Sequence, residues 1–250
     1  VEDGDAILRR VISEVGGSLP RSTARAILSS LYQRARFLAR GPEFDPTLGG
    51  ADPAKNLRLD TFWTAATTLS VVDPIVADGI GVRCLREAMD AGDRTRVIRA
   101  MGLEASREAS LGGGFFRKRT AVLLAAVDRI ASESRDSYDE AWSHLAAGSS
   151  AYFQAEWRTA AQRCALAAAL WREKGRGAVW EIATAESFSL SALAHMGELR
   201  ELERRLPAAI AEAEERGDLY ASTSLRMGVP TLVGLARDRA AEVLRHADSS

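Results

Sequence analysis

The sequence predicts an all-α protein, a right-handed α-α superhelix of antiparallel helix pairs with about 20 residues in each helix. Apolar and small residues recur three and four positions apart, which is the period of amphipathic helices and not the alternation of strands. Pairs of a small residue and an acid recur at multiples of about 21 residues, and each pair can end one helix and cap the next. These pairs are Gly92-Asp93, Ala155-Glu156, Gly197-Glu198 and Gly217-Asp218.

Turn signals fill the intervals between those pairs. One helix with its turn therefore takes about 20 residues and a helix pair about 40, within the range of helical repeat arrays. The further boundaries are Asp73-Pro74, Gly112-Gly113-Gly114, Asp136-Ser137, Gly175-Arg176-Gly177 and Arg237-Asp238.

The chain divides into residues 1–54, predicted to be an N-terminal helical cap or connector with a linker, and residues 55–250, predicted to be the repeat array. A short helix is expected over 3–15. Residues 41–54 are expected to be the irregular linker, because they hold three prolines and three glycines.

The helix expected over 20–40 begins with a Ser18 cap and has Pro20 in its first turn. The basic side of this helix could touch a membrane, but we prefer a solvated face because few bulky apolar residues accompany it. We expect Ile27, Leu28, Leu31, Phe37 and Leu38 to face inward and Arg34, Arg36 and Arg40 to face outward.

The array then continues helix by helix, and Ser137 with Glu140 matches a capping box at the start of its central part. Helices are expected over 57–70, 74–91, 93–110 and 115–132, four within 138–216, one over 218–227 and one or two within 231–247. In the helix over 57–70, one side is expected to carry Leu59, Phe62, Trp63 and Ala66, and in the helix over 93–110, one face is expected to carry Val97, Ala100, Met101, Glu104 and Ala105. In the helix over 115–132, the residues expected inside are Val122, Leu123, Ala126, Val127 and Ile130.

The central stretch 138–216 holds the clearest repeat, with small and packing residues at the offsets of the tetratricopeptide motif. Its period exceeds the roughly 34 residues of that motif, so we interpret it as tetratricopeptide-like with longer helices. One copy comprises Gly148, Ala151, Ala160, Cys164 and Ala167, and a looser copy comprises Leu193, Gly197, Leu202, Leu206 and Ala209.

Charge and hydropathy narrow the classes of partner. The 33 basic and 34 acidic residues give a net charge of -1, which argues against a nucleic-acid footprint. The N-terminus lacks the apolar core of a signal peptide, and no run approaches the roughly 18 apolar residues of a membrane span. We therefore expect a cytoplasmic protein without a membrane partner, and the start at Val1 suggests a fragment of a longer chain. Cys84 and Cys164 are expected to be free, buried thiols.

We predict no catalytic, cofactor-binding or metal-ligating residues and no cofactor. The lysine after Gly112-Gly113-Gly114 does not have P-loop spacing. The histidines lack zinc-ligand spacing, and the acids near the start of a helix suit its dipole better than paired catalysis. These residues are His144, His195 and His246, and Asp136, Asp139 and Glu140.

Four tryptophans of the central stretch form either an aromatic groove for a peptide or a core that locks neighbouring helix pairs together. We prefer the core, because aromatic side chains dominate core burial. The tryptophans are Trp142, Trp157, Trp171 and Trp180.

Two sets of residues carry a family resemblance. The first is Leu59-Asp60, Trp63, Val72-Asp73-Pro74, Ala91-Gly92-Asp93 and Glu104-Ala105. The second is Trp157, Trp180-Glu181, Thr184-Ala185, Gly197-Glu198, Leu202, Pro207, Glu212-Ala213 and Arg216-Gly217-Asp218-Leu219-Tyr220. Residues 55–227 thus resemble the helical C-terminal region of large bacterial signalling proteins, in which a serine/threonine kinase domain and a signal-transduction ATPase module precede tetratricopeptide-like repeats. The resemblance implies that kinase or ATPase activity lies outside this chain.

Three functional hypotheses remain. The first is a non-catalytic interaction and regulatory module that binds a protein or peptide, for which the kinase/ATPase portion of the same polypeptide is one candidate. The alternative is a small-molecule sensor domain of a regulatory ATPase, which a deep pocket lined by tryptophan and arginine would favour. The third is an enzyme, which none of the usual catalytic motifs supports.

Overall fold

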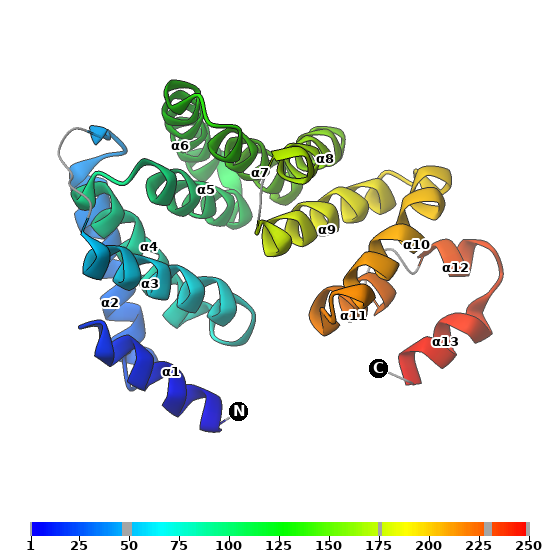
Figure 1. The fold of residues 1–250 in the computed structure, drawn as a ribbon, viewed down its shortest axis with the longest axis horizontal. Helices are drawn as coiled ribbons and strands as arrows, with labels where there is room; N and C mark the ends of the chain where they lie inside the picture. The colour runs from blue at the N-terminus through cyan, green and yellow to red at the C-terminus, as the bar shows by residue number, and fades with distance from the viewer. Residues whose placement is uncertain (1, 47–51, 175–176, 228–231, 249–250) are drawn as a thin grey trace. The chain divides into compact units, whose positions relative to one another are not determined.

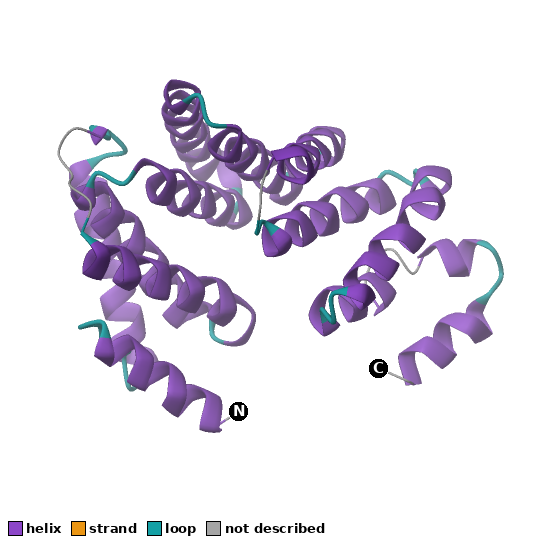
Figure 2. Cartoon of the chain, viewed as in Figure 1, coloured by secondary structure: helices purple, strands orange, loops and turns teal. Residues whose placement is uncertain are grey.

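The computed structural model describes residues 2–46, 52–174, 177–227 and 232–248 (Figure 1). These residues form thirteen α-helices, and no strand occurs in the described ranges (Figure 2). The predicted all-α class is therefore confirmed. Residues 175 and 176 of the expected turn Gly175-Arg176-Gly177 lie outside the described residues.

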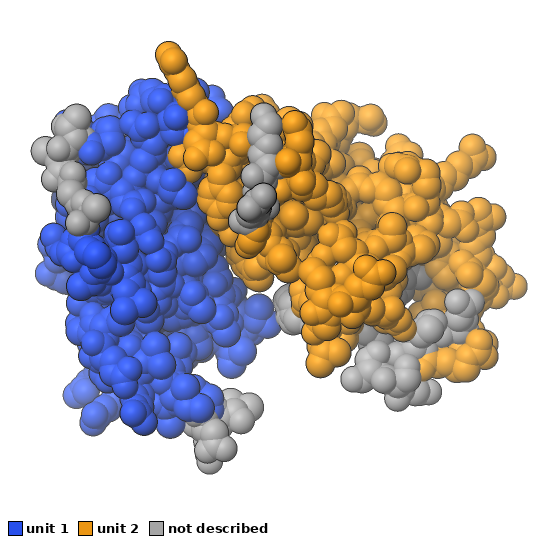
Figure 3. Space-filling view, in the orientation of Figure 1, with its two compact units in different colours: residues 1–105, 121–134 blue, residues 106–120, 135–250 orange. Residues whose placement is uncertain are grey.

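The chain folds as two compact units (Figure 3). The first comprises residues 1–105 and 121–134, and the second comprises residues 106–120 and 135–250, so two of the helices contribute to both units. The helices are α1 (Glu2–Glu14), α2 (Thr23–Arg40), α3 (Pro53–Val72), α4 (Pro74–Ala91), α5 (Arg94–Leu111), α6 (Gly113–Ser134), α7 (Ser137–Phe153), α8 (Trp157–Lys174), α9 (Val179–His195), α10 (Leu199–Glu215), α11 (Leu219–Met227), α12 (Leu232–Ala236) and α13 (Ala240–Asp248).

Helices that follow one another in the sequence pack together within each unit. In the first unit α3 contacts α4, and α4 also contacts α2; in the second, α7, α8 and α9 contact one another and α10 contacts α9 and α11 (Figure 1). Helices α3, α5, α7, α9 and α11 begin at residues 53, 94, 137, 179 and 219, so a helix pair spans 40 to 43 residues. This spacing agrees with the expected pair length of about 40 residues.

The four junctions built from a small residue and an acid all contain a residue in the left-handed conformation, as expected for helix ends. Gly92, Ala155, Gly197 and Gly217 have φ angles between 60° and 71°. Acid capping is less uniform. Asp93 accepts a hydrogen bond from the backbone N–H of Arg96, and Asp218 accepts one from Ala221, but Glu198 makes no such bond.

Other helix starts differ from the prediction. Helix α2 begins at Thr23 with Ser22 as its cap, so Ser18 and Pro20 lie before it. Pro53 and Ala54, expected in the linker, form the first turn of α3 because the Asp52 carboxylate accepts hydrogen bonds from the backbone N–H groups of Ala54 and Lys55.

The starts of α6 and α7 also differ from the prediction. Gly113 and Gly114 belong to α6, whose cap is Gly112. Asp136 caps α7 by accepting from the backbone N–H of Tyr138, which makes Ser137 the first helical residue and excludes the expected capping box.

The residues expected to share one side of α3 and one face of α5 are all buried. On α6, Leu123, Val127 and Ile130 are buried, whereas Val122 is exposed and Ala126 is half-buried. In the second unit, Gly148 of α7 lies against Cys164 of α8, and a Cβ at residue 148 would lie 3.0 Å from the Cys164 backbone nitrogen. The glycine therefore permits the close approach of these two helices.

Candidate interaction surface

Helix α2 exposes a row of apolar residues along one side. Leu28, Leu31 and Leu38 are 66%, 58% and 54% exposed. Ala24, which precedes the leucines, and Ala35, which lies between Leu31 and Leu38, are also exposed. The intervals of four, three, four and three residues place all five on one side of the helix. We call these five residues the leucine stripe. Exposed Ile27 and Tyr32 flank it.

This surface corrects the predicted orientation of α2. The sequence places Ile27, Leu28, Leu31 and Leu38 inside, but all four are exposed; of the residues predicted to face inward, only Phe37 is buried. The buried side of α2 instead consists of Ala26, Ser30, Gln33 and Phe37.

The reason for this orientation is a buried ionic network around Arg34, which was expected to point outward. Arg34 Nη1 donates to Glu104 Oε1 of α5 at 2.7 Å, and Arg34 Nε donates to Asp78 Oδ2 of α4 at 3.0 Å. The Ser30 hydroxyl also donates to Asp78. Burial alone would lower the pKa of Arg34, but the charges and hydrogen bonds of Glu104 and Asp78 outweigh it and raise the pKa. Glu104 is 4% exposed, so turning Arg34 to solvent would leave a buried carboxylate without this partner.

Close backbone packing supports the same orientation. A Cβ at Gly79 of α4 would lie 3.5 Å from the backbone of Ser30, so this glycine brings α4 against the polar side of α2. Arg40 at the end of α2 pairs with Asp90 of α4. The leucine stripe is therefore held on the outside by contacts at both the middle and the end of the helix.

Arginines border the leucine stripe. Arg21, Arg25 and Arg36 are exposed, and within the described part of the chain none of their guanidinium groups has an ion-pair partner. Arg36 lies over the Tyr32 ring, with its guanidinium carbon 5.7 Å from the ring centroid. Helix α2 contains no acidic residue. The exposed side of α2 thus combines apolar side chains with unneutralised positive charge.

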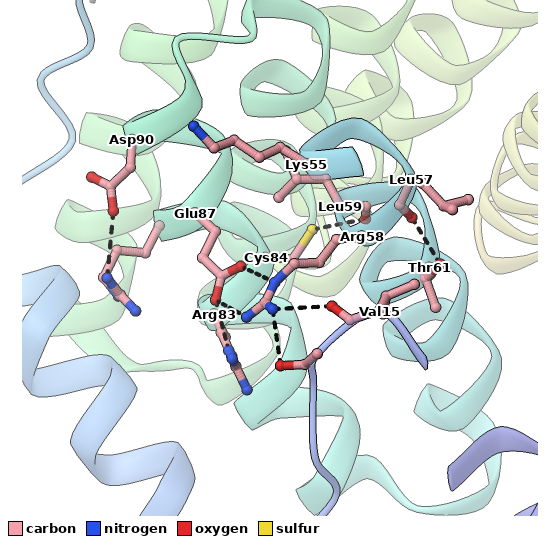
Figure 4. A network of polar contacts seen from close by, with 12 residues as sticks. Val15, Lys55, Leu57, Arg58, Leu59, Thr61, Arg83, Cys84, Glu87 and Asp90 are labelled. Carbon is pink, nitrogen blue, oxygen red and sulfur yellow. Dashed lines mark hydrogen bonds and ion pairs between the residues drawn. The ribbon is translucent and has the colours of Figure 1, made fainter. Parts of the chain in front are cut away.

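A second candidate is a hollow of about 310 Å³ in the first unit, lined by Lys55, Arg58, Leu59, Glu87, Asp90 and Ala91. Beside it, Glu87 accepts hydrogen bonds of 2.8 Å from Nε of both Arg58 and Arg83 (Figure 4). Arg58 Nη1 also donates to the carbonyl oxygens of Val15 and Gly16 at 3.0 and 2.9 Å. This network fastens the end of α1 to α3 and α4.

The charges at the hollow are already engaged. Burial would raise the pKa of Glu87, but the hydrogen bonds from Arg58 and Arg83 outweigh it and hold the pKa below its ordinary value. Asp90 pairs with Arg40 and Arg86. The lining contains no tryptophan, so this hollow is not the pocket of tryptophan and arginine that would favour a sensor.

The four tryptophans occupy two places. Trp142 and Trp171 are buried with ring centroids 5.4 Å apart, and half-exposed Trp180 packs on Trp142 at 6.4 Å. Trp157 is the first residue of α8, and its ring stacks on that of His195 with a centroid distance of 4.3 Å. Trp157 and Trp171 are fourteen residues apart on α8, which corresponds to about 21 Å along the helix. The core interpretation is thus confirmed for Trp142 and Trp171, and the four residues do not form one groove.

Around Trp157 lies a second aromatic cluster in the second unit. Tyr152 contacts Phe153, Trp157 and Phe188 edge-to-face with ring centroids 5.2 to 5.7 Å apart, and its hydroxyl lies 3.2 Å from His195 Nε2. These rings join the end of α7 and the start of α8 to α9. Phe153 is nearly half exposed, which leaves part of the cluster at the surface.

The two cysteines and the histidines singled out in the sequence have the following contacts. Cys84 and Cys164 are buried and free, and burial raises the pKa of each thiol to about 12. His144 lies 2.8 Å from Arg163 Nη1, measured at its Nδ1 atom, and the side chain of His246 lies outside the described part. Among the described residues, no group of three histidines, cysteines or carboxylates could hold a metal ion.

The three acids near the start of α7 differ in their surroundings. Asp136 caps the helix, Asp139 is buried, and Glu140 is exposed and lies 4.0 Å from the His144 ring. Gly112 alone lies between α5 and α6, so a helix and not a strand precedes the glycine cluster.

In the described ranges, no helix combines the length and the apolarity that crossing a bilayer requires. Comparison of the chain with protein-family models, with curated proteins and with solved structures gives no match.

Sequence reasoning missed the leucine stripe, although two signals for it were present. One is the heptad-like spacing of the leucines and alanines between residues 24 and 38, and the other is the absence of any acid from the helix. Which side of α2 is buried depends on Asp78 and Glu104, which are 44 and 70 residues from Arg34. A local pattern does not contain that information.

Proposed function

We propose that this chain is a non-catalytic helical-repeat module that binds a protein or peptide partner and regulates the catalytic portion of a bacterial signalling kinase or ATPase. In this proposal the helix pairs are tetratricopeptide-like, stack as a right-handed superhelix and act in the cytoplasm. The regular spacing of the pairs supports the repeat, because a helix pair buries its apolar sides by stacking on its neighbours.

The leucine stripe is the observation that carries the interaction role. Single exposed apolar residues are common on protein surfaces, but contiguous ones mark interaction sites. Here three leucines, an isoleucine and a tyrosine are exposed on one helix, whereas Phe37 is the only large apolar residue on its buried side. Arg34 joins α2 to Asp78 of α4 and Glu104 of α5. A partner that binds α2 would therefore contact a helix that is linked by ion pairs to two other helices.

The test compares two variants expressed in the source cell. One carries a photo-cross-linking amino acid at position 28, and the other carries it at position 57. Leu57 of α3 is 63% exposed and closely matches Leu28 in exposure. We expect a specific cross-linked protein from position 28 and none from position 57. Equal products from both positions would contradict the role of the leucine stripe.

The regulatory part of the proposal needs a functional readout. In the intact polypeptide or complex that carries the catalytic portion, the double variant Leu28→Gln/Leu31→Gln should change ATP turnover or kinase activity, whereas Leu57→Gln should not. Glutamine keeps good helix propensity, so the variants test the surface and not the helix. Unchanged activity in the double variant would remove the regulatory role.

The sensor alternative rests on the hollow beside Lys55, whose volume of about 310 Å³ lies at the lower end of ligand sites. Native mass spectrometry of the purified chain would test it. A bound metabolite that is lost in Lys55→Ala would favour the sensor, and a ligand-free spectrum would count against it.

A further inference from the structure

We propose that the partner segment that covers α2 is an acidic amphipathic helix, which lies along the leucine stripe with its carboxylates against Arg25 and Arg36. This inference rests on the proposed function and names the chemistry of the partner. It commits to a helix of another protein, in preference to a second copy of this chain or a lipid surface.

The spacing of the leucine stripe fits a helix. Residues at intervals of four and three form the seam along which two helices pack at a shallow crossing angle. Ala24 and Ala35 alternate with Leu28, Leu31 and Leu38, so the small residues leave room for the larger side chains of a partner. The stripe runs over fifteen residues, from Ala24 to Leu38, and so rises about 21 Å, which matches a partner helix of about four turns.

The arginines beside the stripe favour a negatively charged partner. Arg25 and Arg36 lie on the exposed side of α2 and Arg21 precedes it, and none of the three is neutralised in the described part of the chain. Arg34 and Arg40 of the same helix are both paired with carboxylates. A partner with glutamate or aspartate beside its apolar seam would supply the missing counter-charges and would gain association rate and specificity.

The same charges argue against a second copy. Two copies meeting through α2 would bring together two helices that carry unpaired arginines and no acidic residue. Like charges beside the seam of a helix pair oppose its formation.

A lipid surface fits less well than a helix. Helices that lie in a membrane interface present a broad, bulky apolar face. On α2 the alanines interrupt the leucines, and the contacts of Arg34 and Arg40 fix the helix to the folded unit. The geometry therefore favours a narrow seam over an inserted face.

The experiment titrates the full chain with a synthetic three-heptad peptide that has leucine at its seam positions and glutamate beside them. Isothermal titration calorimetry measures binding, and a peptide with lysine in place of every glutamate is the matched probe. We expect binding of the acidic peptide only, with affinity that falls at least about tenfold between about 50 and 200 mM salt.

Variants then locate the site. Leu28→Gln/Leu31→Gln and Arg25→Glu/Arg36→Glu should each weaken binding of the acidic peptide at least about tenfold. Leu57→Gln and Arg158→Glu/Arg200→Glu are the matched controls, because Leu57, Arg158 and Arg200 are exposed residues of other helices, and these variants should bind normally. Equal binding of both peptides, or equal binding by both sets of variants, would overturn the inference.

Two further measurements separate the rejected occupants. Sedimentation on vesicles of phosphatidylcholine and phosphatidylglycerol that is abolished by Leu28→Gln/Leu31→Gln, without peptide binding, would assign the stripe to a membrane. Self-association of the chain that the same variant abolishes would assign it to a second copy. Either result overturns the inference. If position 28 cross-links to a protein in the cell but the acidic peptide does not bind, the inference fails and the proposed function stands.

Discussion

Arg34 Nη1 donates a hydrogen bond to Glu104 Oε1 at 2.7 Å and so joins α2 to α5 across 70 residues of sequence. The Glu104 carboxylate is almost completely buried. This contact, together with the bonds from Arg34 to Asp78, determines which side of α2 faces the core and leaves the leucines outside.

Replacing Arg34 by methionine should destabilise the first unit. Glu104 and Asp78 would then lose a shared counter-charge, and removing one partner of a buried ionic network costs about 3 kcal/mol or more. Urea unfolding would measure the loss. Arg25→Met, on the exposed side of the same helix, should change the free energy of unfolding by less than about 0.5 kcal/mol. Equal stability of the two variants would show that the network contributes nothing.

Glu87 should contribute stability that depends on pH. Burial opposes its ionisation, but hydrogen bonds from Arg58 and Arg83 lower its pKa below the ordinary value of 4.5. Because the folded pKa lies below the unfolded one, the contribution is fully present above about pH 4.5 and is lost as pH falls through the folded pKa. The difference in unfolding free energy between the native chain and Glu87→Gln should therefore shrink below about pH 4.5. A difference that stays constant down to about pH 3 would contradict this assignment.

Substitution of two glycines should have opposite effects. Gly148→Ala places a Cβ 3.0 Å from the Cys164 backbone nitrogen and 3.2 Å from Arg163 Cβ, so α7 and α8 must separate at a cost of about 1 to 3 kcal/mol. Gly114→Ala in α6 meets no atom within 4 Å and should stabilise the protein by up to about 1 kcal/mol. Thermal and urea unfolding would measure both. A neutral Gly148→Ala would disprove the close packing at this position.

Both cysteines should resist thiol reagents in the folded chain. Cys84 and Cys164 are buried, and burial raises the pKa of each to about 12, so little thiolate exists near pH 8. Ellman's reagent should titrate two thiols rapidly in urea and almost none without it. Rapid labelling of Cys84 or Cys164 in the folded chain would mean that the surrounding helices open readily.

The order and the ends of most helices could be predicted from the sequence because they depend on local chemistry. The carboxylate of Asp73 and the fixed φ of Pro74 act within one turn, as do the left-handed glycines at 92, 197 and 217. Where two caps compete nearby, as Ser18 and Ser22 do before α2, local rules do not select between them. The correct cap is then known only from the structure.

The candidate surface could not be predicted in the same way. The leucines of α2 satisfy an inward amphipathic pattern as well as an exposed seam, and the free energy that decides between them comes from Asp78 and Glu104. On α5 the residues expected to share one face are all buried, so the local pattern and the core agree there. On α2, hydrophobic periodicity therefore predicts the wrong side because a buried ionic contact opposes it.

The left-handed residues between successive helices also limit how such a chain can change in length. Each of the junctions at Gly92, Ala155, Gly197 and Gly217 turns the backbone through one residue, and the next helix begins two residues later. Adding a single residue inside a helix would rotate everything after it by about 100° and turn its buried side chains toward water. Duplication or loss of a whole pair of 40 to 43 residues keeps every buried side in place. The structural period of this chain is therefore also the smallest step by which gene duplication can lengthen it without disturbing its core.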